Sequence, residues 1–535
     1  MSQHAPTNPN SLGGVSPVRE MMQIALPAIV TMTSYAVMTF VDRWIVSELG
    51  ADAIAGVGNG GIFAFLAAAF GLGSLTVINT YASQNLGAGK PREGSAYAWN
   101  GLWISVMYWA IVLLPIAFFL PHIFTGMRGI FGVGEIAEAT VRIETDYGRI
   151  LLSGMVFMIA ARGIAHYFYG LHKSWVVMVS SIAGNLVNLP LTYMLVHGLW
   201  IMPELGTNGA AVATVVGSFV ELAIPMAIFL SSKYDTAYHT RRVWRPSLHH
   251  MHDLLRIGWP AGFMFSSEIV CWWVLTAGYT ARFGSVQNAA GWAAMNYMHL
   301  SFMPAVGISI AATALVGKCM GAGRPDLAVQ RTWLCLKFAV GYMAVCALCF
   351  VLFRHPMLAL FSGGDHFTPE EAAEFIRIGS WVLIVAAAFQ VFDAVAITFT
   401  GALRGAGDTI WPGLITLVLS WSFIMGGGWL MVTYAPGLES IGPWMAGAAF
   451  IIVLSIVLLL RFMAGSWKTM KVLRDRPGAE LKDSFGAGIL AAADEAYAEA
   501  PPVHASIEDV PPANPGGGTE RGAFPTPADP GGPER

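Results

Sequence analysis

Long apolar runs, broken by short polar segments, follow one another through most of the chain. The runs at 104–120, 410–432 and 446–460 are almost free of charge. Crossing the apolar core of a bilayer takes about 20 residues of α-helix, so these runs predict membrane-spanning helices. Glycine and proline within such runs fit this interpretation, because neighbouring helices can satisfy the backbone groups that they free.

The same pattern predicts twelve spans. We place them at residues 20–48, 55–82, 95–121, 144–170, 174–199, 207–231, 254–282, 288–316, 330–353, 374–403, 409–433 and 441–463. Composition agrees, since 55% of the residues are hydrophobic and 12% are charged, against about 25% charged in an average soluble domain. The chain is therefore expected to be an all-α membrane protein.

Landmarks in the first half of the chain recur in the second half. Three pairs are 234 or 235 residues apart, and each half also opens with a proline early in its first span. The pairs are the sequences GAGKP and GAGRP (from Gly87 and Gly321), Gly50 with Gly284, and Gly170 with Gly405, and the prolines are Pro27 and Pro260. Because each half has six spans, both halves insert with the same orientation, which predicts a pseudo-twofold axis along the membrane normal.

The repeat divides the chain into two lobes of six helices, at 20–231 and 254–465, joined by a basic loop at 232–253. Lys and Arg gather in the connections on one side of the membrane, which predicts that this side, the segment at 1–19 and both termini are cytoplasmic. We expect the protein in the inner (plasma) membrane. The tail at 478–535 is rich in Ala, Gly, Pro and acidic residues, and such a segment is expected to be disordered.

Three acidic residues lie deep inside predicted spans: Asp42, Glu268 and Asp393. They are about 12, 24 and 17 Å from the polar ends of their spans, at about 1.5 Å per residue. A charge at the bilayer centre costs about 2.5–3.5 kcal/mol on insertion scales, so such residues normally face a cavity and mark ion or proton paths. The alternative is a carboxyl group hydrogen-bonded to a neighbouring helix, and Glu221 is a weaker case of the same kind.

Other polar residues lie in the same spans. Arg43 and Arg162 could neutralise some of the acidic charge, although adjacent helical residues point in different directions, so Arg43 is not automatically the partner of Asp42. Four amides are expected to line the cavity, with interhelical hydrogen bonding as the alternative. They are Asn185, Asn188, Asn296 and Gln390.

Two motifs suggest other chemistry but match it poorly. The sequence around GAGKP lacks a P-loop pattern, because Gln84 stands where the first glycine belongs and Pro91 follows the lysine. We interpret it as a tight cytoplasmic turn. The cluster LHHMHD, with His249, His250 and His252 before Asp253, is interpreted as a solvated loop, with a metal site as the alternative. The chain also has no H-E-x-x-H or G-x-S-x-G motif, so we do not expect an enzyme.

The residues around the three acids resemble the multidrug and toxin extrusion (MATE) family, in its NorM-like bacterial branch. The similar segments are VDRWIVSELGADAIAGVG with Asp42, GWPAGFMFSSE with Glu268, and FQVFDAVAITFTGALRGAGDT with Gln390 and Asp393. The resemblance covers residues 20–465. It implies an antiporter that exports organic, often cationic or amphipathic, compounds in exchange for Na+ or H+.

The resemblance also implies roles for the acids. Glu268 and Asp393 would form a cation site, possibly for Na+, and Asp42 would serve protonation or substrate binding. The implied partners are small organic substrates, a monovalent cation and the lipid bilayer, with no nucleic acid and no cofactor, and the protein would function as a monomer. Phe389 stands where Na+-coupled relatives often have a tyrosine, and Thr192 where an aspartate is common.

If Glu268 and Asp393 meet, they form a site that is stable when it holds a proton or Na+ and strained when it is empty. Such a cation can shift the balance of two lobe arrangements only through its different affinity for them. The alternative function is a flippase of lipid-linked glycans from the same superfamily. That activity favours a cationic cavity, whereas the first lobe offers two span arginines, Arg43 and Arg162.

Overall fold

The computed structural model describes residues 16–131, 138–362 and 368–473, and this part of the chain consists of helices and turns. Twelve of its segments are long and apolar enough to cross a membrane, which confirms the predicted number of spans. The tail predicted at 478–535, and nearly all of the segment at 1–19, lie outside the described residues.

The first half of the described chain forms the helices that we call the N lobe. They are α1 (Pro17–Ser47), α2 (Ala51–Leu75), α3 (Val77–Gly87), α4 (Pro91–Tyr108), the π-helical turn η1 (Trp109–Leu113), α5 (Leu114–Phe131), α6 (Glu138–Gly170), α7 (Ser174–His197) and α8 (Thr207–Phe229). α1 packs against α7, α2 against α6, and α8 against both α6 and α7. Buried side chains such as Leu152, Tyr167 and Phe168 fill the core between them.

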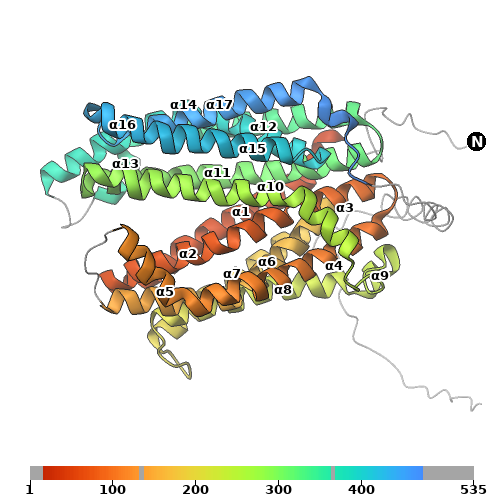
Figure 1. The fold of residues 1–535 in the computed structure, drawn as a ribbon, viewed down its shortest axis with the longest axis horizontal. Helices are drawn as coiled ribbons and strands as arrows, with labels where there is room; N and C mark the ends of the chain where they lie inside the picture. The colour runs from red at the N-terminus through yellow and green to blue at the C-terminus, as the bar shows by residue number, and fades with distance from the viewer. Residues whose placement is uncertain (1–15, 132–137, 363–367, 474–535) are drawn as a thin grey trace, which may run out of the picture. The chain divides into compact units, whose positions relative to one another are not determined.

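The second half forms the C lobe. It contains α10 (Leu248–Trp273) with the turns η2 (Val274–Tyr279) and η3 (Thr280–Phe283), α11 (Ser285–Gly321), α12 (Pro325–Leu352), α13 (Arg354–Ser362), α14 (Pro369–Ala406), α15 (Ile410–Leu419), η4 (Ser420–Gly427), α16 (Gly428–Tyr434), η5 (Pro436–Leu438), α17 (Ile441–Ala464) and η6 (Ser466–Thr469). Here α14 is central and packs against α11, α12 and α17. Figure 1 shows the two groups of helices and the short helix α9 (Ser232–Tyr238) that lies between them in the sequence.

The segment at 232–253 is more ordered than a solvated loop. It contains α9, and α10 begins at Leu248, so the expected loop supplies the first residues of a membrane helix. The start of α10 is fixed to the N lobe, because the Ser247 amide donates a hydrogen bond to the side-chain oxygen of Asn100 (2.8 Å). The Ser247 hydroxyl also forms a hydrogen bond with the ring of His250, one turn into α10 (2.9 Å).

Equivalent turns of the two halves share one backbone geometry. Gly89 and Gly323 both have positive φ (71° and 68°). The amide that follows each glycine donates five residues back, from Lys90 to Asn85 (2.8 Å) and from Arg324 to Cys319 (2.9 Å). This is a left-handed helix C-cap that favours glycine. The GAGKP sequence is therefore a tight turn, as expected, and not a phosphate loop.

Glycines bring the two lobes into close contact in reciprocal pairs. A Cβ atom added to Gly73 of α2 would lie 2.9 Å from the Cα atom of Gly262, and one added to Gly307 of α11 would lie 2.9 Å from the Cα atom of Ile29. Gly73 and Gly307 are equivalent in the repeat, and so are Ile29 and Gly262. Because equivalent residues exchange partners, the lobes are related by a pseudo-twofold axis.

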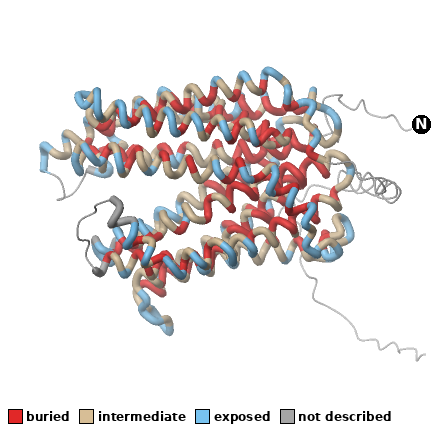
Figure 2. The backbone as a smooth tube through the Cα atoms, in the orientation of Figure 1, coloured by how far each residue is buried: buried red, intermediate tan, exposed pale blue. Residues whose placement is uncertain are grey.

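This axis passes close to Ser83 and Gly317, which are equivalent residues in contact with each other. A Cβ atom on Gly317 would collide with the Ser83 hydroxyl. Lys318 follows Gly317, and its carbonyl packs on Gly87, just as the Gln84 carbonyl packs on Gly321. Figure 2 shows buried residues gathered where α3, α10 and α11 meet.

Hydrogen bonds join the lobes at the same end. Thr80 of α3 donates to the Arg404 carbonyl (2.8 Å), and Gln84 donates to the Gly405 carbonyl (2.9 Å), both at the end of α14. Asn79 donates to the Ile310 carbonyl of α11 (3.3 Å). The lobes are therefore held together at the end that carries the GAGKP and GAGRP turns.

Candidate functional site

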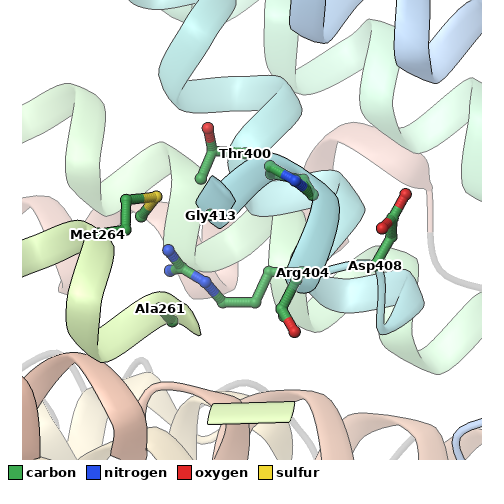
Figure 3. A pocket seen from close by; sticks show the side chains of 8 residues that line it. Ala261, Met264, Thr400, Arg404, Asp408 and Gly413 are labelled. Carbon is green, nitrogen blue, oxygen red and sulfur yellow. The ribbon is translucent and has the colours of Figure 1, made fainter. Parts of the chain in front are cut away.

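A small pocket lies between α10, α14 and α15 of the C lobe. It holds about 10 Å³ of free space, room for about one water molecule. Its lining residues are Ala261, Met264, Thr400, Arg404, Asp408, Thr409, Pro412 and Gly413. Figure 3 shows the Arg404 side chain reaching toward Ala261 and Met264, while Asp408 lies apart from it. The Asp408 carboxylate is instead bound by Arg461 (2.8 Å), so Arg404 brings its positive charge to the pocket.

Helical spacing places the predicted acids on the faces that line this pocket. Glu268 follows Met264 by four residues on α10, and Asp393 precedes Thr400 by seven on α14. Residues four or seven apart lie on one side of a helix. The two carboxylates therefore continue the pocket lining, on the side of it away from the end where the lobes are joined.

The structure brings Glu268 and Asp393 together. Both are half-buried, and their carboxylates are close enough to interact electrostatically. Glu268 also interacts electrostatically with Arg404. Within the described part of the chain, neither carboxylate accepts a hydrogen bond, so their oxygens are available to a bound cation.

Asp42 lies in the N lobe, in a different setting. Its Oδ1 atom accepts a hydrogen bond from the Thr192 hydroxyl of α7 (3.2 Å). Asp42 and Arg43 both interact electrostatically with Tyr147 of α6. Arg43 also interacts electrostatically with His299 of α11. Arg43 therefore lies within electrostatic range of residues in both lobes.

A polar cluster that the sequence did not predict ties α1 to α6, α7 and α8. The Tyr35 hydroxyl donates to the Glu221 carboxylate, and the Arg162 guanidinium lies 3.8 Å from the centre of the Tyr35 ring. Asn185 donates to both oxygens of Ser34, at 3.1 and 3.0 Å. Arg162 and Glu221 therefore both contact Tyr35, which joins them. The apolar residues around Tyr35 in the first span did not indicate this role.

The four amides fall into different environments. Gln390 is 1% exposed and donates to the Ser301 hydroxyl (2.7 Å). Asn188 is also 1% exposed and packs against Gly217 of α8, and neither side-chain atom has a hydrogen-bond partner among the described residues. Asn185 is half-buried and Asn296 is exposed. Gln390 therefore makes an interhelical hydrogen bond, the alternative considered for the amides, whereas Asn188 is buried against α8 without one among the described residues.

The histidine cluster is part of the contact between the lobes. His249 lies 3.3 Å from Asp253, one helical turn away. His250 lies 3.5 Å from Glu93 of α4. His250 and Asp253 are buried, whereas His249 and His252 are exposed. All four residues belong to α10, so the expected solvated loop is instead a helical turn with one buried face. Among the described residues, no group of three His, Cys, Asp or Glu side chains is arranged to hold a metal ion.

Comparison with known proteins gives the context for this site. The MatE family model matches residues 27–194 and again residues 260–429. The matches begin at Pro27 and Pro260, the prolines that open the two halves of the repeat. One model thus describes both lobes, which confirms the repeat independently of the turns and glycines.

The chain is also similar to individual proteins over most of its length. A probable multidrug resistance protein NorM of Thermotoga maritima is 26% identical over 469 residues, which cover 85% of this chain and 94% of that protein. A crystal structure of MATE in complex with MaL6 has a TM-score of 0.74 at 20% identity, covering 85% of this chain and 98% of that one. A MOP superfamily transporter from Pyrococcus furiosus, for which reverse polarity of the binding pocket suggests a different function, has a TM-score of 0.73 at 21% identity and the same coverage.

At such identities the solved structures show the shared fold alone. The family model adds more, because its two matches cover well over half of the chain, including both prolines and all three membrane acids. The chain therefore belongs to the MatE family, whose members are multi-pass membrane transporters and not enzymes.

Proposed function

We propose that the protein is a cation-coupled antiporter that exports organic, cationic or amphipathic compounds by alternating access, with Na+ or H+ as the coupling ion. One observation carries this proposal. Glu268 and Asp393 come from different helices, interact electrostatically, and accept no hydrogen bond within the described chain. Two carboxylates that share a site repel each other when both are charged, so a bound proton or Na+ stabilises the pair.

The arrangement of the lobes supports alternating access. They are joined at the end with the GAGKP and GAGRP turns, through Thr80, Gln84 and Asn79. The excess of Lys and Arg on that side favours a cytoplasmic location, in the inner membrane of a bacterium. The structure would then represent the state that is closed toward the cytoplasm, and a protein with a complete site in one chain would work as a monomer.

The surroundings of Asp393 bear on the coupling ion. Na+ needs oxygen ligands beyond two carboxylates. Phe389, one turn before Asp393, is 4% exposed and packs in the C-lobe core, where it offers no oxygen. Gln390 is already bonded to Ser301. These features favour H+ over Na+ at this site.

The proposal is tested by efflux from proteoliposomes under separately imposed Na+ and pH gradients. We expect an ethidium-like organic cation to be exported under one of the two gradients, with the pH gradient favoured by the surroundings of Asp393, and export to stop in Glu268→Gln and Asp393→Asn. Glu370→Gln is the matched control, because Glu370 lies exposed at the start of the same helix as Asp393. Wild-type rates in either acid variant, or no response to both gradients, would contradict the proposal.

The flippase alternative requires a cationic cavity for phosphate groups. Arg162 of α6 already interacts electrostatically with Glu221 and stacks on Tyr35. Its charge is thus balanced within the lobe, and the antiporter remains the better-supported function.

A further inference from the structure

A buried ionic cluster joins the lobes where α1 meets α11 and α12. The Glu20 carboxylate of α1 accepts a hydrogen bond from the Lys318 ammonium (2.9 Å) and lies 3.3 Å from the Arg331 guanidinium. The Glu20 side chain is 10% exposed and that of Arg331 is 2% exposed. Both cations belong to the C lobe, so this acid of the N lobe is held entirely by the other lobe's charges.

His172 completes the cluster from the turn between α6 and α7. Its Nδ1 atom is 3.7 Å from Glu20 and its Nε2 atom is 3.4 Å from the Ala314 carbonyl. Burial and the Lys318 charge lower the pKa of His172 to about 4, although the Glu20 carboxylate opposes both effects. His172 is therefore neutral near pH 7, and the charged members are Glu20, Lys318 and Arg331.

The pseudo-twofold axis gives this cluster an equivalent on the other side of the interface. Asp253 of α10 occupies the position of Glu20, at the offset that separates the two opening prolines. Its carboxylate accepts a hydrogen bond from the Tyr97 hydroxyl of α4 (3.1 Å), and its carbonyl accepts one from Tyr81 (3.0 Å). Tyr97 is in turn the repeat equivalent of Arg331. Each lobe thus sends an acid from its first helix into the other lobe, and one of the two contacts is ionic.

We propose that Glu20, with Lys318 and Arg331, forms a latch that keeps the lobes together at this end and sets the balance between the two conformations of the transporter. The inference rests on the alternating access proposed above, because that mechanism requires this end to open. Opening must separate Glu20 from both cations. Removing Glu20 alone would take away the acid that faces the buried Arg331 guanidinium and the part-buried Lys318 ammonium in the closed state, which is destabilising.

Glu20 is a positioning residue in this proposal, since it acts on the lobes and not on the cation or substrate. Losing it should raise the fraction of molecules open at this end about tenfold or more. Reversing the charges should restore the closed state, because a lysine at 20 and a glutamate at 318 can form the same pair. The Asp253 contact would resist opening less, since a hydrogen bond from a neutral phenol is weaker than a charge-assisted pair.

The test measures distances between nitroxide labels on Ala88→Cys and Ala322→Cys, equivalent positions in the two turns, in a chain whose five native cysteines are replaced. Electron–electron resonance should give one short distance for the parent, a longer population for Glu20→Gln and Glu20→Lys, and a return to the short distance for Glu20→Lys with Lys318→Glu. Glu439→Gln, which breaks the exposed pair with Arg377 (2.8 Å) near the other end of α14, should leave the distances unchanged.

An unchanged distance distribution in both Glu20 variants would overturn the latch, and so would a charge reversal that fails to restore closure. If Glu20→Lys does not fold, as judged by size-exclusion elution, Glu20→Asp provides the second variant and should give an intermediate open fraction. The distance measurement needs no transported compound. A failed export assay would therefore count against the proposed function alone, and unchanged distances alongside loss of export in Glu268→Gln would count against the latch alone.

Discussion

The two lobes have the same fold but use equivalent positions for opposite chemistry. Carrying the Pro27–Pro260 offset along the first helix of each lobe places Tyr35 at the position of Glu268. The Gly170–Gly405 offset places Tyr169 at the position of Arg404. In each lobe the two residues lie close to one another. The repeat therefore places a polar site at equivalent positions of the two lobes. The side chains at those positions determine whether the site is charged.

The partners of the acids differ accordingly. In the N lobe, Glu221 accepts a hydrogen bond from Tyr35 and Asp42 accepts one from Thr192. In the C lobe, Glu268 and Asp393 have each other and the Arg404 charge. An acid whose oxygens are satisfied by the protein gains little from a cation, whereas an unsatisfied pair gains much. On this basis we expect ion binding in the C lobe and fixation of α1 in the N lobe.

The largest expected effect comes from neutralising the C-lobe pair. Glu268→Gln should reduce cation-driven export about 100-fold or more, because removing one member of a buried charged site costs about 3 kcal/mol or more. Tyr35→Phe, at the equivalent N-lobe position, should leave export within a few-fold of the parent. Rates of dye efflux in proteoliposomes give both values. Equal losses in the two variants would remove the distinction between the lobes.

The second prediction concerns stability in the N lobe. Tyr35→Phe removes the hydrogen bond to Glu221, and a hydrogen bond to a charged group contributes about 1.5–3 kcal/mol. We expect a lower thermal unfolding temperature in detergent, measured by tryptophan fluorescence. Tyr434→Phe is the control, since Tyr434 is 75% exposed and its loss should change nothing. A Tyr35→Phe protein as stable as its control would show that the N-lobe cluster does not fix α1.

Arg404 offers a sharper test of the C-lobe site. The Arg404 charge interacts with Glu268 and therefore competes with a bound cation for the negative charge of the carboxylates. Arg404→Gln should raise the apparent affinity of the site for the coupling ion about tenfold. The measurement is export rate as a function of cation concentration or pH. Arg377→Gln, in the exposed pair with Glu439, is the control. A weaker apparent affinity in Arg404→Gln would mean that Arg404 orders the site and does not compete for it.

The smallest expected effect is a dependence of lobe opening on pH. It comes from a histidine of the N lobe whose equivalent in the C lobe is a glycine. His172 is the repeat equivalent of Gly407, and both residues have positive φ (59° and 95°). The pKa of His172 is about 4 in the closed state, against an ordinary 6.5, so protons favour any state that exposes this ring to water. The groups that face it are Glu20, Lys318, Lys173 and the Ala314 carbonyl.

Because the closed-state pKa is the lower one, closure weakens as the pH falls through 6.5 toward 4 and is fully present above that window. The open-to-closed ratio should rise about fourfold between pH 8 and pH 6. Label distances on the two turns, recorded across this range, measure it. The rise should disappear in His172→Gln. If that variant keeps the same pH dependence, other titrating groups control the opening.

Much of the fold could be predicted from the sequence, because membrane-spanning helices require long apolar segments that are visible in the sequence. Apolar length gave the twelve spans, and the spaced glycines and prolines gave the repeat. The rare charges in apolar runs identified Asp42, Glu268 and Asp393. These features depend on single helices, and a single helix is visible in a linear pattern.

The pairings were not predictable, because they depend on the rotation of helices about their axes and on contacts between distant segments. Lys318 follows the predicted span at 288–316 and Arg331 lies at the edge of the one at 330–353, and these positions predict no partner, whereas in the structure both contact Glu20. Arg404 likewise follows the predicted span at 374–403, whereas α14 runs to Ala406. Nothing in the apolar pattern distinguished a helical cation at the membrane edge from one in a loop.

The contact of Ser83 with Gly317 carries a lesson about how such a chain can diverge from a dimer of identical halves. A residue on a twofold axis meets its own copy, so a symmetric pair of six-helix chains would face serine with serine at a place where even one added Cβ atom collides. When the two halves belong to one chain, a residue of one half can be substituted without the same substitution in the other half. One half can then keep a hydroxyl while the other gives up its side chain, and the same independence lets a tyrosine stand in one lobe where a glutamate stands in the other.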